Sequence, residues 1–99
     1  MDKSKFLNSF KPKSATHKLP DDSEISINEL TLEQRGKLMA AAKKDAMAAQ
    51  ALVVCMGCDM FTETDIKDVS ALSGEIVTSI ADAILDLSGL SDGDARKNS

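Results

Sequence analysis

Residues 46–60 read AMAAQALVVCMGCDM, and they form the longest apolar-rich stretch of this 99-residue chain. The run from Leu52 to Met56 is hydrophobic on all sides of a helix, so it needs more cover than two helices and a hairpin provide. Gln50 and Asp59 interrupt the stretch, which is shorter than the roughly 18 apolar residues of a membrane-spanning helix. It therefore predicts a core helix with some surface left for a partner, and no membrane span.

Working toward the N-terminus, the pattern Thr31-Leu32-Glu33-Gln34 matches a capping box, so a helix is expected to begin there. Gly57 and Asp59 weaken its far end, and we predict one continuous helix over residues 31–58. Its apolar side chains recur every three or four positions and would form a single stripe. The stripe contains Leu38, Ala42, Ala46, Ala49, Val53, Met56 and Met60.

Working toward the C-terminus, residues 62–65 repeat the capping-box pattern and begin a helical segment predicted over residues 62–88. Ser73-Gly74 is expected to divide this segment into a short and a longer helix. Gly89 followed by Leu90 is typical of a glycine cap at a helix end. The segment has the clearest amphipathic pattern in the chain, with apolar residues at positions 66, 69, 72, 76, 80, 84 and 87.

Before the first helix, residues 15–30 predict a β-hairpin whose turn contains Pro20 and Asp21, and whose second strand alternates Ile25 and Ile27 with polar residues. The predicted fold is mainly α: a small helical domain of two to three amphipathic helices with a short N-terminal β-hairpin. We expect a flexible basic N-terminus over residues 1–14, a single folded domain over residues 15–90 and a disordered tail over residues 91–99.

The chain is short and unevenly charged. Ninety-nine residues can bury one modest core but not an enclosed catalytic cleft, so we do not expect an enzyme. Residues 1–18 carry a net charge of +4 and the remainder −8. The basic segment has no Arg, so nucleic acid is not an expected partner. The N-terminus has no apolar run typical of a secretory signal, which predicts a cytoplasmic protein that does not bind membranes.

The motif Cys-Met-Gly-Cys, formed by Cys55 and Cys58, is the one in this chain most suggestive of redox chemistry or metal binding. A redox pair needs its first cysteine at a helix N-terminus, whereas this pair lies toward a predicted C-terminal end. A zinc site needs about four ligands, and His17 is the single histidine. We therefore expect packing residues and no cofactor or metal, with a redox or zinc module as the minor alternative. The carboxylates Asp82 and Asp86 predict a solvated acidic face.

Methionine side chains adapt to irregular partner surfaces, although in a helical stripe they more often belong to a core. The predicted helix 31–58 and the residues just after it hold four of the five methionines. The surface predicted to bind a partner consists of Met39, Met47, Leu52, Met56, Met60 and Phe61.

The order of these signals resembles the tail assembly chaperones of long, flexible-tailed bacteriophages and prophages. The resemblance covers roughly residues 15–90 and includes ISINELT at 25–31, LVV at 52–54, MFTETDI at 60–66 and IADAILDLSGL at 80–90. The family has a longer turn before the Phe-Thr element, where this chain has only residues 57–60.

The resemblance implies a non-enzymatic role in the host bacterial cytoplasm. The chain would bind the phage tape measure protein and keep it soluble during tail assembly. The tail tube protein is a second candidate partner, and the chain is also a candidate homo-oligomer. The resemblance further implies a programmed frameshift, for which the codons of Arg96-Lys97-Asn98 are candidates. The alternative from another class is a small helical DNA-binding or antitoxin-like regulator.

Overall fold

The computed structural model describes residues 2–90, so the tail expected to be disordered, residues 91–99, lies outside the described residues. The fold is mainly helical with a two-stranded antiparallel sheet, as predicted, but residues 2–90 form five α-helices instead of two to three. The elements are α1 (Lys3–Ser9), β1 (Ser14–Lys18), β2 (Glu24–Asn28), α2 (Leu32–Lys44), α3 (Ala46–Gly57), the 3-10 helix η1 (Glu63–Asp65), α4 (Ile66–Ser70) and α5 (Gly74–Leu87).

The predicted hairpin is confirmed. β1 and β2 pair antiparallel, with His17 opposite Ile25. Ile25 and Ile27 are both buried, so the alternating pattern does identify the inner face of β2. The hairpin packs on α5, where His17 Nε2 lies 3.1 Å from Ser79 Oγ. Two strands alone are marginal in water, and α5 supplies the apolar surface that they need.

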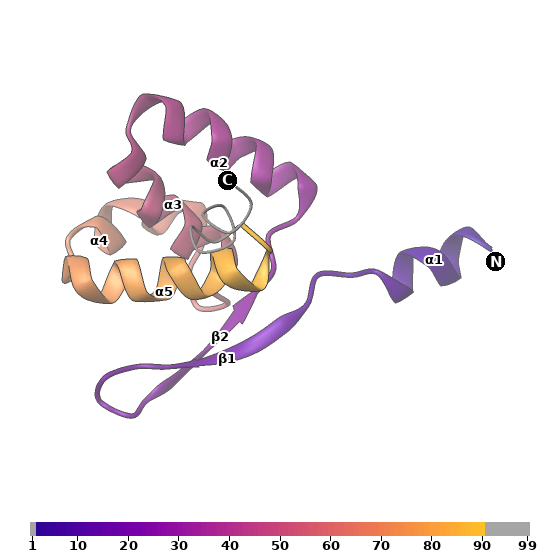
Figure 1. Cartoon of the computed structure of the whole chain (residues 1–99), viewed down its shortest axis with the longest axis horizontal. Helices are drawn as coiled ribbons and strands as arrows, with labels where there is room; N and C mark the ends of the chain where they lie inside the picture. Colours follow the sequence, from indigo (N-terminus) through magenta and orange to yellow (C-terminus); the bar gives the residue numbers. More distant parts are fainter. Residues whose placement is uncertain (1, 91–99) are drawn as a thin grey trace, which may run out of the picture.

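The prediction of one helix over residues 31–58 is wrong, because the chain breaks at Asp45. Asp45 has an extended backbone (φ −160°, ψ 102°), and its carboxylate accepts the N–H groups of Met47 at 3.0 Å and Ala48 at 3.2 Å. A short acidic side chain competes for backbone donors in this way, which favours it as a helix cap over a helix interior. The chain changes direction here, so the predicted stripe is shared between two helices (Figure 1).

Helix α3 is the centre of the domain. It contacts α2, α4, η1 and α5, and half of its 12 residues are buried. These residues are Ala49, Ala51, Val53, Val54, Cys55 and Gly57. A helix that is apolar on all sides is stable in water only when other elements surround it. The stretch that is most apolar in the sequence therefore becomes the element on which the others pack.

The end of α5 has the glycine cap that the sequence predicts. Gly89 adopts φ +75°, its N–H donates to the Asp86 carbonyl at 3.1 Å, and the Leu90 N–H donates to the Leu85 carbonyl at 2.7 Å. This is the Schellman arrangement, which brings an apolar residue after the glycine back toward the last helical turn. The cap thus returns Leu90 to the neighbourhood of Leu85.

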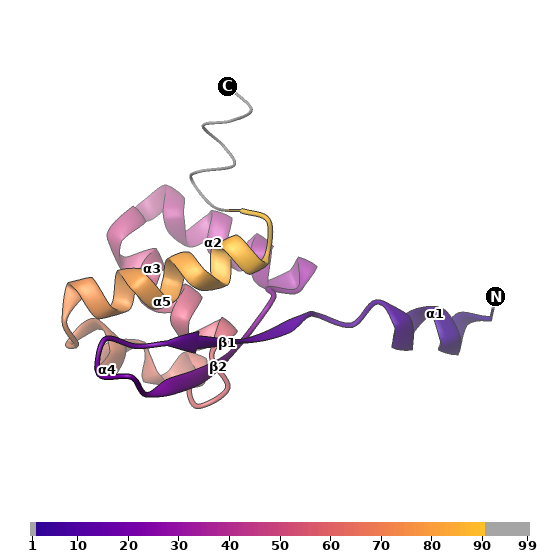
Figure 2. The same cartoon turned by 60° about the horizontal axis from the view of Figure 1, so that its bottom comes forward.

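The N-terminal segment, which the sequence predicts to be flexible, contains a short helix. Asp2 caps a helix, α1, by accepting the Lys5 N–H at 2.8 Å. Helix α1 stands away from the rest of the domain on an extended segment, which Figures 1 and 2 show from two directions. None of its seven described residues is buried.

Candidate functional site

Helices α2 and α5 lie on either side of α3 (Figure 1). Residues of the three helices line an open groove of about 420 Å³. We call this surface the α2–α5 groove. Its lining is apolar apart from two residues, Gln50 and Asp82. The lining residues are Leu38, Met39, Ala42, Ala46, Ala49, Gln50, Val53, Ala81, Asp82, Leu85 and Leu90.

The groove forms because both flanking helices pack mainly on α3. The alanines that line the groove have small side chains, so another helix can approach the backbone closely. Gln50 does not make the groove polar, because its Oε1 accepts a hydrogen bond from Thr78 Oγ1 on α5 at 2.8 Å. What remains is an apolar channel of the kind that holds the hydrophobic face of an amphipathic helix.

One end of the groove is fixed by Ser88, which is 4% exposed. Its hydroxyl donates to the Ile84 carbonyl at 2.7 Å and accepts the Leu30 N–H at 2.9 Å. Arg35 Nη2 donates to the Ser88 carbonyl at 2.5 Å. The start of α2 is therefore tied to the end of α5, and these bonds keep the two helices at a set separation.

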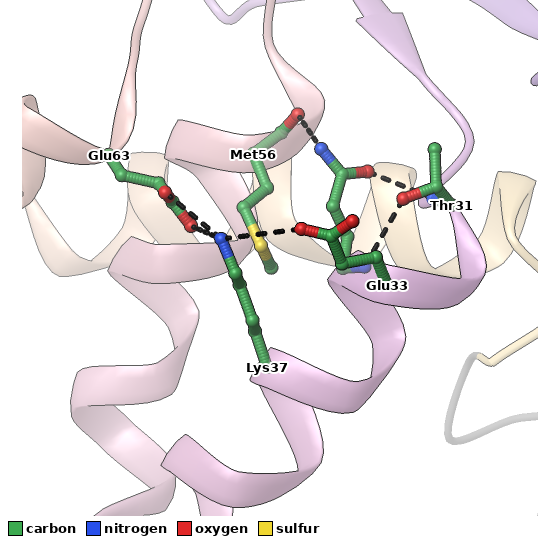
Figure 3. Close-up of polar contacts among 6 residues, drawn as sticks. Thr31, Glu33, Lys37, Met56 and Glu63 are labelled. Atoms are coloured by element: carbon green, nitrogen blue, oxygen red, sulfur yellow. Dashed lines mark hydrogen bonds and ion pairs between the residues drawn. The ribbon is translucent and has the colours of Figure 1, made fainter.

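The other side of α2 is held by polar contacts to the end of α3 and to η1 (Figure 3). Lys37 Nζ lies 3.2 Å from Glu63 Oε1 and 4.0 Å from Glu33 Oε1. Gln34 Nε2 donates to the Met56 carbonyl at 3.3 Å, while the Gln34 side chain also completes the predicted cap at Thr31. These contacts turn the apolar face of α2, with Met39 and Ala42, toward the groove.

The α5 wall of the groove carries one carboxylate. Asp82 lines the groove, and Asp86 follows one helical turn later. Both side chains are exposed, and neither takes part in an ion pair with another residue of the described range 2–90. They leave negative charge beside an apolar channel.

The residues predicted to bind a partner do not form one surface. Met39 is 66% exposed and lies in the α2–α5 groove, whereas Met47 lines a separate depression of about 350 Å³ beside α4 and the start of α5. Met60 is 60% exposed in the turn after α3.

The other three predicted residues are half-buried: Leu52, Met56 and Phe61. Met56 and Phe61 pack against the core, and in Figure 3 Met56 lies among the contacts that hold α2. The sequence reasoning missed the α5 side of the groove, Ala81, Leu85 and Leu90. The Gly89 cap was the one signal that placed Leu90 near a helix end.

The cysteines are placed as core residues. Cys55 and Cys58 are free and 3% exposed, and burial raises the pKa of both thiols above the ordinary value. Burial disfavours the thiolate that redox chemistry and zinc binding need. Among the described residues, no group of three or more His, Cys, Asp or Glu side chains is placed to hold a metal ion.

His17 and Ser79 form a histidine–serine contact that the sequence did not predict. Neither side chain is among the residues that line the depressions at the start of α2, beside α4 and between α2 and α5. The contact joins β1 to α5 and so acts in packing the hairpin.

No helix within residues 2–90 combines the length and the apolar character needed to cross a lipid bilayer. Comparison of the chain with models of known protein families, with curated proteins and with solved structures finds no match. The α2–α5 groove is therefore characterised by its own geometry and chemistry alone.

Proposed function

We propose that this chain is a non-enzymatic tail assembly chaperone of long, flexible-tailed phages or prophages, acting in the host cytoplasm. In this role it holds an amphipathic helix of the tape measure protein in the α2–α5 groove. The observation that supports the proposal most directly is the groove itself, an apolar channel between two helices with Met39 exposed on one wall.

The physical role of such a groove is to remove an apolar stripe from water. A long helix with an uncovered stripe aggregates, and a groove that covers the stripe prevents contact between copies. Residues 19–99 carry a net charge of −8, so chaperone molecules bound along one partner repel each other and keep the complex in solution. The methionine on the wall adjusts to successive turns whose side chains differ.

The test is to co-express the chain with the long helical tail protein that the adjacent gene encodes. The measured quantity is the fraction of that tail protein that stays in solution. The wild-type chain is expected to increase the soluble fraction. If it has no effect, the proposed function is wrong.

Two matched variants locate the binding surface. Met39→Glu places a charge in the groove, whereas Met60→Glu places the same charge at a similarly exposed position outside it. Both changes are at the surface and should alter the free energy of unfolding by less than about 0.5 kcal/mol. Met39→Glu should weaken partner binding roughly tenfold and Met60→Glu should leave it unchanged. Equal effects would mean that the groove is not the binding surface.

A further inference from the structure

Helix α1 and Phe10, which follows it, carry an apolar face that the described domain leaves mostly exposed. Phe6, Leu7 and Phe10 are 53%, 57% and 70% exposed, and the two phenyl rings lie 5.0 Å apart between centroids, so they form one patch. Isolated helices of fewer than about 12 residues are marginal in water, and most helical stability in proteins comes from packing an apolar face. A seven-residue helix such as α1 therefore needs another surface to pack against.

The arm formed by α1 and residues 10–13 projects from its own domain, and only its base, Phe10 and Pro12, lines a depression beside Leu30, Leu32 and Arg35 at the start of α2. Lys13 is anchored to Glu29 by two hydrogen bonds, from the Lys13 N–H to Glu29 Oε1 at 3.0 Å and from the Glu29 N–H to the Lys13 carbonyl at 2.8 Å. Pro12 then fixes its own φ. To reach its own groove, the arm would have to reverse direction within residues 10–12, whereas Figures 1 and 2 show it projecting outward.

The arm and the α2–α5 groove have complementary chemistry. The groove is mostly apolar and has the carboxylate of Asp82 on its α5 wall, with Asp86 one helical turn further along α5. The arm is apolar and carries Lys3, Lys5 and Lys11, none of which pairs with a carboxylate within residues 2–90. Opposite charges around apolar surfaces favour association and fix its orientation.

We infer that the arm of one copy docks in the α2–α5 groove of a second copy, and that the exchange is reciprocal in a two-fold dimer. This inference concerns the isolated chain and does not rest on the proposed function. The arm and a partner helix would use the same groove, so each excludes the other, and partner binding would release the arms.

The first test is sedimentation equilibrium of the full chain over a range of concentrations. We expect a dimer whose dissociation constant rises with salt. Phe6→Ser with Phe10→Ser should raise that constant roughly tenfold or more, because aromatic anchors dominate small interfaces. Met60→Ser with Leu72→Ser removes exposed apolar side chains from outside the arm and the groove, and should leave it unchanged. A monomeric wild type, or equal weakening by the control, would overturn the inference.

A charge exchange tests the pairing itself. Lys3→Glu with Lys5→Glu gives an acidic arm, and Asp82→Lys with Asp86→Lys gives a basic groove wall. Each variant alone then opposes like charges and should dimerise more weakly than the wild type. In an equal mixture, both arms meet grooves of opposite charge, so a heterodimer tighter than either variant alone is expected. A mixture no tighter than its components contradicts the model.

Crosslinking distinguishes an arm that docks in the groove of a second copy from an arm that docks in the groove of its own chain. Leu7→Cys in one chain and Ala42→Cys in another should form a disulfide-linked dimer when mixed under mild oxidation, since the native thiols are buried. With both substitutions in one chain, a disulfide within the monomer would place the arm in its own groove and refute exchange. All three tests omit the tape measure protein, so their failure is distinct from failure of the proposed function.

Discussion

Helices α2 and α3 are consecutive in the chain and nearly equal in length, with 13 and 12 residues, but they differ in what surrounds them. None of the 13 described residues of α2 is buried, whereas six residues of α3 are. Both helices are rich in alanine, so helix propensity does not separate them. Helix α3 carries the β-branched residues Val53 and Val54, which α2 lacks, and both are fully buried beneath the neighbouring elements.

The difference shows how one apolar stretch provides both a core and a binding surface. Helix α3 is covered on the sides facing α4, η1 and α5, whereas the sector between α2 and α5 is open. Helix α2 contributes a wall with little burial of its own, so its surface can change without loss of the core. Substitutions in the two helices should therefore have different consequences.

The largest contrast is expected from the same change at a glycine of each helix. A Cβ added at Gly57 in α3 would lie 2.6 Å from Ile84 Cγ2 and 2.8 Å from Ile84 Cδ1, and Ile84 is fully buried. Gly57→Ala should therefore lower the free energy of unfolding by about 1–3 kcal/mol through overpacking, although alanine is the better helix former.

The matched change in α2 should have the opposite sign. A Cβ at Gly36 meets nothing within 4 Å, so Gly36→Ala should stabilise the domain by about 0.5–1 kcal/mol through reduced backbone entropy in the unfolded chain. Urea unfolding followed by circular dichroism measures both, since the chain has no Trp or Tyr. Two changes of the same sign would contradict the distinction between a packed and an open helix.

An effect smaller than the contrast between the two glycine variants should follow from changing the boundary between the helices. Asp45→Ala removes the oxygen that accepts the Met47 and Ala48 N–H groups, and should cost about 0.5–2 kcal/mol. Asp45→Asn keeps an acceptor at the same position and should cost much less. Thermal unfolding compares the two variants. If Asp45→Asn destabilises the domain as much as Asp45→Ala does, the negative charge of Asp45 contributes the stability and the capping hydrogen bonds do not.

How far the sequence predicts this fold depends on the range of the interactions involved. The hairpin and the cap at Thr31 were predicted because alternation and capping are decided within a few residues. The break at Asp45 was missed because good helix formers stand on both sides of it, and local propensity favours continuing the helix. The Asp45 cap makes a break possible, and the packing of α3 among its neighbours favours the break over a continuous helix.

The groove was harder to predict because its walls come from distant parts of the chain. Met39 on α2 and Leu85 on α5 are brought together only through α3. Methionine was a poor guide by itself, since Met56 packs against the core while Met39 and Met60 are exposed. Whether a methionine lies in the core or on the surface depends on the tertiary fold. The periodicity of one helix does not reveal which of the two applies.

The smallest effect should be a dependence on alkaline pH that comes from α3 and its C-terminal cap, and not from α2. Burial raises the pKa of the Cys55 and Cys58 thiols above the ordinary value of about 8.5. Between the unfolded and folded pKa values, the unfolded chain binds fewer protons than the folded one, so stability falls as pH rises. The contribution is fully present below the unfolded pKa and is lost as pH rises through the folded pKa.

Thermal unfolding of the wild type and of Cys55→Ala with Cys58→Ala, from neutral pH to about pH 10, measures this dependence. The paired substitution also removes packing, so the slope of Tm against pH is compared instead of Tm itself. The wild type should lose Tm more steeply above pH 8.5 than the variant. Parallel slopes would show that the thiols ionise equally well in the folded and unfolded chains, which would be inconsistent with their burial beneath the other helices.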